Sequence, residues 1–121
     1  LGGGIYSIEG KVSRCKVYKN EGSADGAGIR NEDGAVDNCD VYDNVSPGRC
    51  GGIAGGGVSN CRVYGNSGYG IFGSATNCKV YENVKGISAS SVTNCLVYGN
   101  ACEGITGTKV QNCTVYGNGG P

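Results

Sequence analysis

The chain has 121 residues, including 25 Gly and 8 Cys, and its 10 basic residues balance its 10 acidic residues. A zero net charge does not favour nucleic acid as a partner, and no apolar run approaches the ~18 residues needed for membrane insertion. The glycine-rich composition indicates one domain of tight turns and thin strands covering residues 1–121.

One phrase, Asn-Cys-x-Val-Tyr-x-Asn, recurs six times with small variations, and a Gly-Ile pair lies between successive copies. Its cysteines are spaced by 24, 22, 17, 17 and 18 residues, whereas the length from Cys to the closing Asn is constant. A strand of fixed length followed by a turn of variable length is typical of a β-solenoid. The six coils are anchored at Cys15, Cys39, Cys61, Cys78, Cys95 and Cys113.

In chain order, each coil is expected to hold three short strands. The first carries the isoleucine of Gly-Ile, the second carries a valine (Ala75 in one coil), and the third is Cys-x-Val-Tyr. Alternation within the third strand predicts Cys and Val inside and Tyr outside. The isoleucines are Ile5, Ile29, Ile53, Ile71, Ile87 and Ile105, and the valines are Val12, Val36, Val58, Val92 and Val110.

Two asparagine columns accompany the strands. The asparagine that closes each phrase can donate to one neighbouring coil and accept from the other, which predicts an asparagine ladder. The asparagine before each Cys suits a bend in the left-handed conformation. The ladder column is Asn20, Asn44, Asn66, Asn83, Asn100 and Asn118, and the bend column is Asn38, Asn60, Asn77, Asn94 and Asn112.

The pattern Val-x-Asn-Cys-x-Val-Tyr-x-Asn with the following Gly-Ile resembles the parallel β-helix repeat of the pectin-lyase-like superfamily, over nearly the whole chain. The resemblance implies an all-β fold, a right-handed parallel β-helix of about six coils with three short strands per coil. It implies no single function, because lyases, glycosidases, phage tail fibres and adhesins share such coils.

Catalysis is not expected. The sequence has no histidine to activate a serine, threonine or cysteine nucleophile, and the carboxylates show no clear catalytic cluster. Seven of the ten acidic residues lie between positions 21 and 43, where Glu32, Asp33 and Asp37 form a weak candidate Ca²⁺ site. The alternative is a solvated acidic face, and no other cofactor is expected.

The cysteines divide into two groups. The six repeat cysteines share one inward column, where they are interpreted as buried free thiols, with vertical disulfides as the alternative. Cys50 and Cys102 each lie three residues before a Gly-Ile isoleucine and are candidates for bonding to another chain, or else small turn residues.

The tyrosines form the most suggestive surface feature. A stacked phenol column would stabilise the sheet, form a lateral packing seam, or bind surface glycans. The strip consists of Tyr18, Tyr42, Tyr64, Tyr81, Tyr98 and Tyr116.

The two ends of the sequence, joined head to tail, read as a further repeat. This predicts a non-catalytic structural module, extracellular or on the cell surface, that stacks on copies of itself or is part of an elongated fibre or stalk. The alternative is a carbohydrate-binding or polysaccharide-lyase-like fragment using the Tyr strip or the acidic loops. The residues expected at the end-to-end contact are Leu1, Gly4, Ile5, Tyr116, Asn118 and Pro121.

Overall fold

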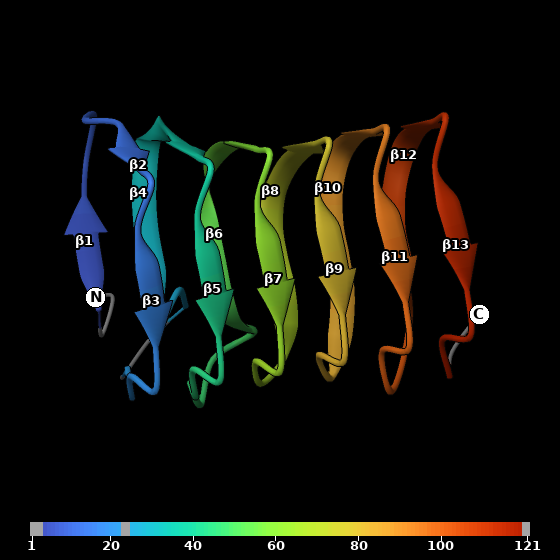
Figure 1. The fold of residues 1–121 in the computed structure, drawn as a ribbon, viewed down its shortest axis with the longest axis horizontal. Helices are drawn as coiled ribbons and strands as arrows, with labels where there is room; N and C mark the ends of the chain where they lie inside the picture. Colours follow the sequence, from blue (N-terminus) through green and yellow to red (C-terminus); the bar gives the residue numbers. More distant parts are fainter. Residues whose placement is uncertain (1–3, 23–24, 120–121) are drawn as a thin grey trace.

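The computed structural model describes residues 4–22 and 25–119, and its strands stack as a parallel solenoid of about five turns in two sheets (Figure 1). The described residues contain no helix. The long-strand sheet holds β1 (Ile5–Ser7), β2 (Val12–Ser13), β4 (Ile29–Asp37), β6 (Cys50–Ser59), β8 (Tyr69–Thr76), β10 (Lys85–Thr93) and β12 (Ile105–Gln111). The short-strand sheet holds β3 (Lys16–Tyr18), β5 (Asp40–Tyr42), β7 (Arg62–Tyr64), β9 (Lys79–Tyr81), β11 (Leu96–Tyr98) and β13 (Thr114–Tyr116).

The expected all-β parallel solenoid is confirmed. The six copies of the phrase give the six strands of the short-strand sheet, and about five turns lie between them. In Figure 1 the nearer strands descend and the farther strands ascend as the coil advances from the N-terminal end, which is a right-handed winding. This is the hand favoured for parallel crossover connections.

The number of strands per coil differs from the expectation. The isoleucine and valine strands of a coil were expected to be separate, but β4 contains both Ile29 and Val36 in one continuous strand. The intervening residues stay extended because the next coil offers partners along part of that stretch, for example Ala54 beside Arg30. In the first coil the two strands remain separate, as β1 and β2.

The core is a set of aligned columns. Strand register places each isoleucine on the isoleucine of the next coil, as Ile29 lies between Ile5 and Ile53. The inner isoleucines and valines, such as Ile71 and Val80, are fully buried. At roughly 1.5–3 kcal/mol for each fully buried aliphatic side chain, these columns supply the main stabilisation of the stack.

The asparagine ladder and the bends form as predicted. The backbone N and Nδ2 of Asn66 both donate to Oδ1 of Asn83, at 2.9 and 3.0 Å, and the same pattern recurs in the neighbouring coils. The asparagines before each Cys have φ of 52–55°. Arg14, which replaces asparagine in the first coil, adopts the same conformation with φ 56°.

Candidate functional site

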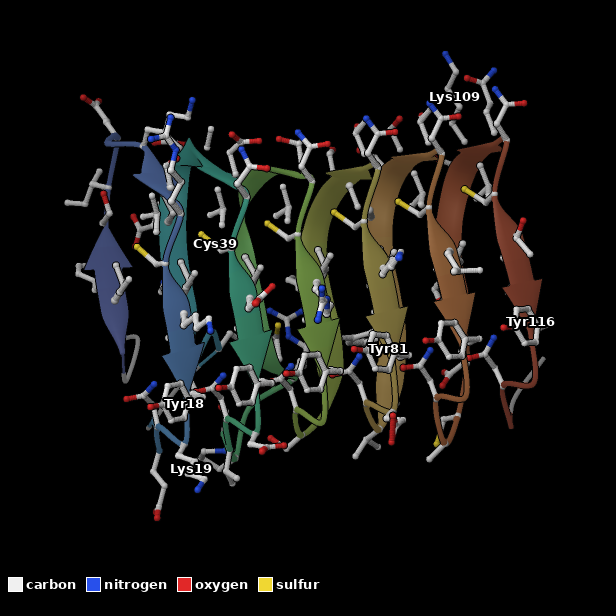
Figure 2. The ribbon with its side chains drawn as sticks, viewed as in Figure 1. Tyr18, Lys19, Cys39, Tyr81, Lys109 and Tyr116 are labelled. Atoms are coloured by element: carbon white, nitrogen blue, oxygen red, sulfur yellow. The ribbon has the colours of Figure 1, made fainter. Side chains whose placement is uncertain are left out.

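A continuous aromatic strip runs along the outer side of the short-strand sheet (Figure 2). Each tyrosine is the last residue of its strand and faces outward, as the alternation of the phrase predicts. Neighbouring ring centroids lie 4.8–5.3 Å apart, and the ring planes are within 7° of parallel. The strip is Tyr18, Tyr42, Tyr64, Tyr81, Tyr98 and Tyr116.

The stacking determines what the strip offers to a ligand. Burial in the stack, then the Tyr18 phenol and nearby carboxylates, raise the pKa of Tyr42, so its phenol is uncharged at neutral pH. Inner rings have a neighbour against both faces, which leaves their edges and hydroxyl groups exposed. Among the described residues, the end rings, Tyr18 and Tyr116, each have no aromatic neighbour on one face, and they are 48% and 55% exposed.

The core is open at both ends of the described stack. Val110 and Val115 are 44% and 46% exposed, whereas their counterparts one coil earlier, Val92 and Val97, are fully buried. A hollow of about 340 Å³ at the N-terminal end is lined by Gly4, Ile5, Cys15, Lys16, Val17, Tyr18 and Asn20. A hollow of about 390 Å³ at the other end is lined by Gly104, Ile105, Val110, Val115, Tyr116, Gly117 and Asn118.

The asparagine ladder has a direction, so its two ends are different. Between asparagines, the bonds all run one way: each donates to the asparagine of the following coil, from the pair Asn20–Asn44 to the pair Asn100–Asn118. Among the described residues, Oδ1 of Asn20 accepts no hydrogen bond and the backbone N–H of Asn118 has no acceptor. The N-terminal end of the described stack therefore offers a hydrogen-bond acceptor, and the C-terminal end offers a donor.

These ends contain the residues expected at an end-to-end contact. Gly4 and Ile5 line the N-terminal hollow, and Tyr116 and Asn118 line the C-terminal one. The remaining two predicted contact residues, Leu1 and Pro121, lie outside the described residues.

The three carboxylates of the candidate calcium site do not come together. Glu32 and Asp33 are both exposed in the irregular middle of β4, and Asp37 lies at the far end of the strand. Glu32 instead pairs with Arg30 at 3.4 Å. No group of three or more His, Cys, Asp or Glu among the described residues could hold a metal ion, so the expected clustering is not observed.

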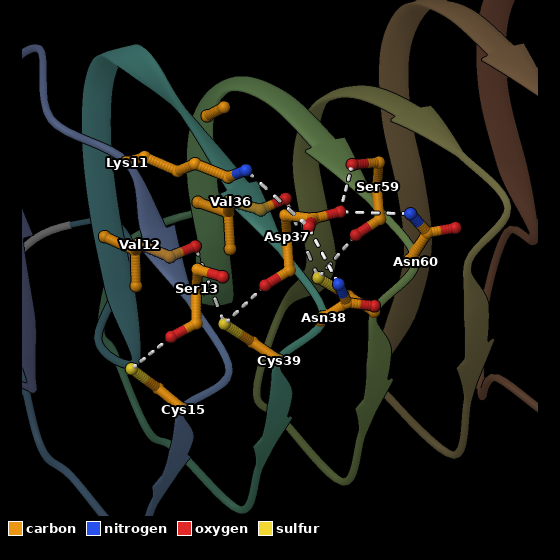
Figure 3. Close-up of polar contacts among 12 residues, drawn as sticks. Lys11, Val12, Ser13, Cys15, Val36, Asp37, Asn38, Cys39, Ser59 and Asn60 are labelled. Atoms are coloured by element: carbon orange, nitrogen blue, oxygen red, sulfur yellow. Dashed lines mark hydrogen bonds and ion pairs between the residues drawn. The ribbon is translucent and has the colours of Figure 1, made fainter.

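Asp37 is instead the centre of a polar cluster that links three coils (Figure 3). It accepts hydrogen bonds from Asn38, Ser59 and Asn60 at 2.8–3.0 Å, and the Lys11 ammonium lies 3.9 Å away. The hydrogen bonds from Asn60 and Ser59 hold the pKa of Asp37 below its usual range. This carboxylate is satisfied by the fold and has a structural role.

The two cysteines outside the column occupy different environments. Cys50 is fully buried at the start of β6, its Sγ donates to the carbonyl of Ile53 at 3.1 Å, and burial raises its pKa to about 12. A buried thiol does not fit bonding to another chain, which was one of the two interpretations of Cys50 from the sequence. Cys102 is half-buried in the turn after β11 and remains a candidate for contact with another chain.

A groove of about 810 Å³ over the long-strand sheet was not anticipated from the sequence. In one wall, the Arg49 guanidinium lies 4.5 Å from the centre of the Phe72 ring and is held by Asp25 at 3.1 Å. Burial pushes the pKa of Asp25 upward, but N–H groups of Cys50 and Arg49 and the guanidinium outweigh it and lower the pKa. Asp25 and Arg49 are 24 residues apart, and the first two repeats have the same spacing. This spacing places the two residues in neighbouring coils, so it could have predicted their contact.

The fold and its surfaces define the chain as a parallel β-solenoid with cysteine, asparagine and tyrosine ladders. No protein-family model, curated protein or solved structure matches the chain. The resemblance described above is therefore confirmed for the solenoid fold and not for the superfamily. Within the described residues, no helix is long and apolar enough to cross a membrane.

Proposed function

We propose that the chain is a non-catalytic structural module of an elongated extracellular or cell-surface fibre or stalk. In this proposal coils stack head to tail, either between copies of this chain or with coils of a longer chain. The observation that carries it is the pair of complementary ends, one with an unused ladder acceptor at Asn20 and the other with an unused donor at Asn118 among the described residues. Stacked in register, Val17 would cover Val115 and the ring of Tyr18 would cover that of Tyr116.

Membership of the pectin-lyase-like superfamily is part of this proposal. It is supported by the repeat phrase together with the parallel solenoid fold. Because that fold serves many functions, membership would be compatible with a fibre and with a glycan-binding module.

The purified chain is expected to form filaments at neutral pH. Six rungs at ~4.8 Å would give an axial repeat of about 29 Å, visible by electron microscopy. If Cys102 links filaments side by side, a reducing agent will disperse bundles and leave single filaments intact. Discrete monomers at all concentrations would contradict assembly between copies.

A matched pair of variants tests whether the ends make the contact. Val115→Lys places a charge in the open C-terminal core and should abolish filaments, because a lysine there cannot be buried by the next copy. Val84→Lys is the control, since Val84 is similarly exposed (44% against 46%) but lies in a turn on the side of the solenoid. Equal filament formation by the two variants would place the contact elsewhere.

A carbohydrate-binding module is the second candidate function, and the groove beside Arg49 and Phe72 favours it. Two residues of the acidic segment, Asp25 and Glu32, line this groove, and Phe72 holds the Arg49 guanidinium, which can donate hydrogen bonds to a sugar. Titration with pectic and other acidic or neutral oligosaccharides, followed by tyrosine fluorescence, separates the two functions. The structural module predicts no saturable change, whereas a saturable change lost in Phe72→Ala would favour the glycan binder.

A further inference from the structure

The cysteine column is a regular array of identical thiols. In every coil Sγ donates to the carbonyl two residues earlier in the chain, at 3.1–3.4 Å. Figure 3 shows this contact for Cys15 with Ser13 and for Cys39 with Asp37. Because the same contact recurs, the side chains have the same orientation and are related by the translation from one coil to the next.

That translation fixes the gap between neighbouring sulfurs. Cys39 and Cys61 lie in adjacent coils, since the Arg62 N–H donates to the Cys39 carbonyl at 2.9 Å. Adjacent coils are ~4.8 Å apart, and the tyrosine rings of these coils have a centroid spacing of 4.8 Å. In the orientation that all six side chains share, this translation separates neighbouring sulfurs by far more than the ~2 Å of an S–S bond, and the thiols of the column are free.

We infer that neighbouring thiols of this column bind soft, two-coordinate d¹⁰ cations, with one ion between two sulfurs. A metal–thiolate bond is about 2.3 Å for the d¹⁰ ion zinc, so a linear S–metal–S unit spans about 4.6 Å, close to the rung spacing. Thiolates are the ligands that soft metals select. The gap between neighbouring free thiols in this orientation therefore accommodates a linear bridge without movement of the strands.

Among soft two-coordinate d¹⁰ cations, the divalent mercuric ion fits best, because its charge balances that of two thiolates. Two thiols release two protons to solvent, two Hg–S bonds form, and the resulting unit is neutral. A monovalent ion between two thiolates would leave one negative charge in a buried site, which is costly. Zinc does not fit, because it takes four ligands and no described group of three or more suitable side chains exists.

The column has room for three ions. Six thiols in a row pair completely in one way, as Cys15–Cys39, Cys61–Cys78 and Cys95–Cys113. The outer members, Cys15 and Cys113, are half-buried, whereas Cys61 and Cys78 are 3% and 1% exposed. Ions should therefore fill the outer pairs quickly and the central pair slowly, after local opening of the coils.

The test uses the full chain carrying Cys102→Ser, which removes the half-exposed thiol outside the column. The reduced protein is titrated with Hg²⁺ without oxygen, and bound metal is counted after gel filtration. We expect three ions per chain, two sulfurs at about 2.3 Å around each by X-ray absorption, and an unchanged β-sheet circular dichroism spectrum. Excess Zn²⁺ should not reduce the count.

Two double variants separate pairing from simple thiol content. Cys61→Ala with Cys78→Ala leaves two neighbouring pairs, and Cys39→Ala with Cys78→Ala leaves one, although both retain four column thiols. Both remove two fully or nearly fully buried cysteines, so similar losses of stability are expected. The variant with Cys61→Ala and Cys78→Ala should bind two Hg²⁺ per chain, and the variant with Cys39→Ala and Cys78→Ala should bind one.

Equal binding by the two double variants would overturn the proposal. In the parent chain, one sulfur per ion, or loss of the β-sheet signal on binding, would overturn it independently of whether either variant folds. The result does not depend on the proposed fibre function, because the column lies within a single chain.

Discussion

Replacing Asn66 by alanine is expected to lower the free energy of unfolding by about 3–5 kcal/mol. Its Nδ2 donates to the carbonyls of Val41 and Tyr64, each at 3.1 Å, and to Oδ1 of Asn83 at 3.0 Å. Its Oδ1 accepts from the backbone N and Nδ2 of Asn44, both at 3.0 Å. Alanine leaves these buried donors and acceptors without partners, and urea unfolding followed by circular dichroism measures the cost.

Asn20→Ala is the matched control at the open end of the ladder. Asn20 is half-buried and its amide donates to Asn44 and Tyr18. Water can therefore replace many of the hydrogen bonds that are lost when Asn20 becomes alanine. A loss of about 0.5–1.5 kcal/mol is expected. Similar losses for Asn20→Ala and Asn66→Ala would mean that burial of the ladder contributes little to stability.

The columns of the solenoid could be predicted because they depend on local alternation and on the repeat. The inward position of Val80 and the outward position of Tyr81 follow from strand geometry, and the ladder position of Asn83 follows from its constant distance from Cys78. Because the phrase repeats, each inference made for one coil also applies to the equivalent residues of the other coils.

The merging of two expected strands could not be predicted in the same way. Between Ile53 and Val58 the sequence is Ala-Gly-Gly-Gly, which has the composition of a turn. In the structure this segment belongs to β6, because β4 and β8 on either side supply hydrogen-bond partners. Strand pairing between coils overrides the local preference for a turn, and the sequence of one coil does not show which residues pair with the next coil.

A second left-handed column was also missed. The residue after each tyrosine has φ of 56–68°, and it is a glycine in three coils but a charged residue in the others. The charged members are Lys19, Asp43 and Glu82, and the glycines are Gly65, Gly99 and Gly117. The three glycines were a usable signal, but the charged residues masked it because non-glycine residues are uncommon in this conformation.

The surfaces were less predictable than the core. The tyrosine strip followed from one repeated position, whereas the groove depends on Asp25, Arg49 and Phe72, which occupy positions that vary between coils. Cys50 was interpreted as a candidate for bonding to another chain or as a small turn residue, but β6 begins at this residue and buries it. Features that occur once per molecule require the packing between coils to be known.

Replacing Gly86 by alanine is expected to lower the free energy of unfolding by about 2–4 kcal/mol. Gly86 is the glycine of a Gly-Ile pair, and an added Cβ would contact the carbonyl oxygen of Gly104 in the next coil and lie 3.0 Å from Cγ1 of Val97. The same carbonyl accepts the Ile87 N–H at 2.8 Å, so separating the strands also weakens a hydrogen bond of the sheet. Close approach of two coils thus explains why glycine precedes isoleucine in the repeat, and thermal or urea unfolding measures the effect.

Gly57→Ala is the control in the same sheet. An added Cβ at Gly57 meets no atom within 4 Å, and the backbone there is outside the left-handed region, so alanine adds no clash. Reduced flexibility of the unfolded chain should make this variant neutral or more stable by about 0.4–1 kcal/mol. If Gly86→Ala were equally well tolerated, the coils would be able to separate at little cost, and the close packing that fixes the thiol and tyrosine spacings would not be rigid.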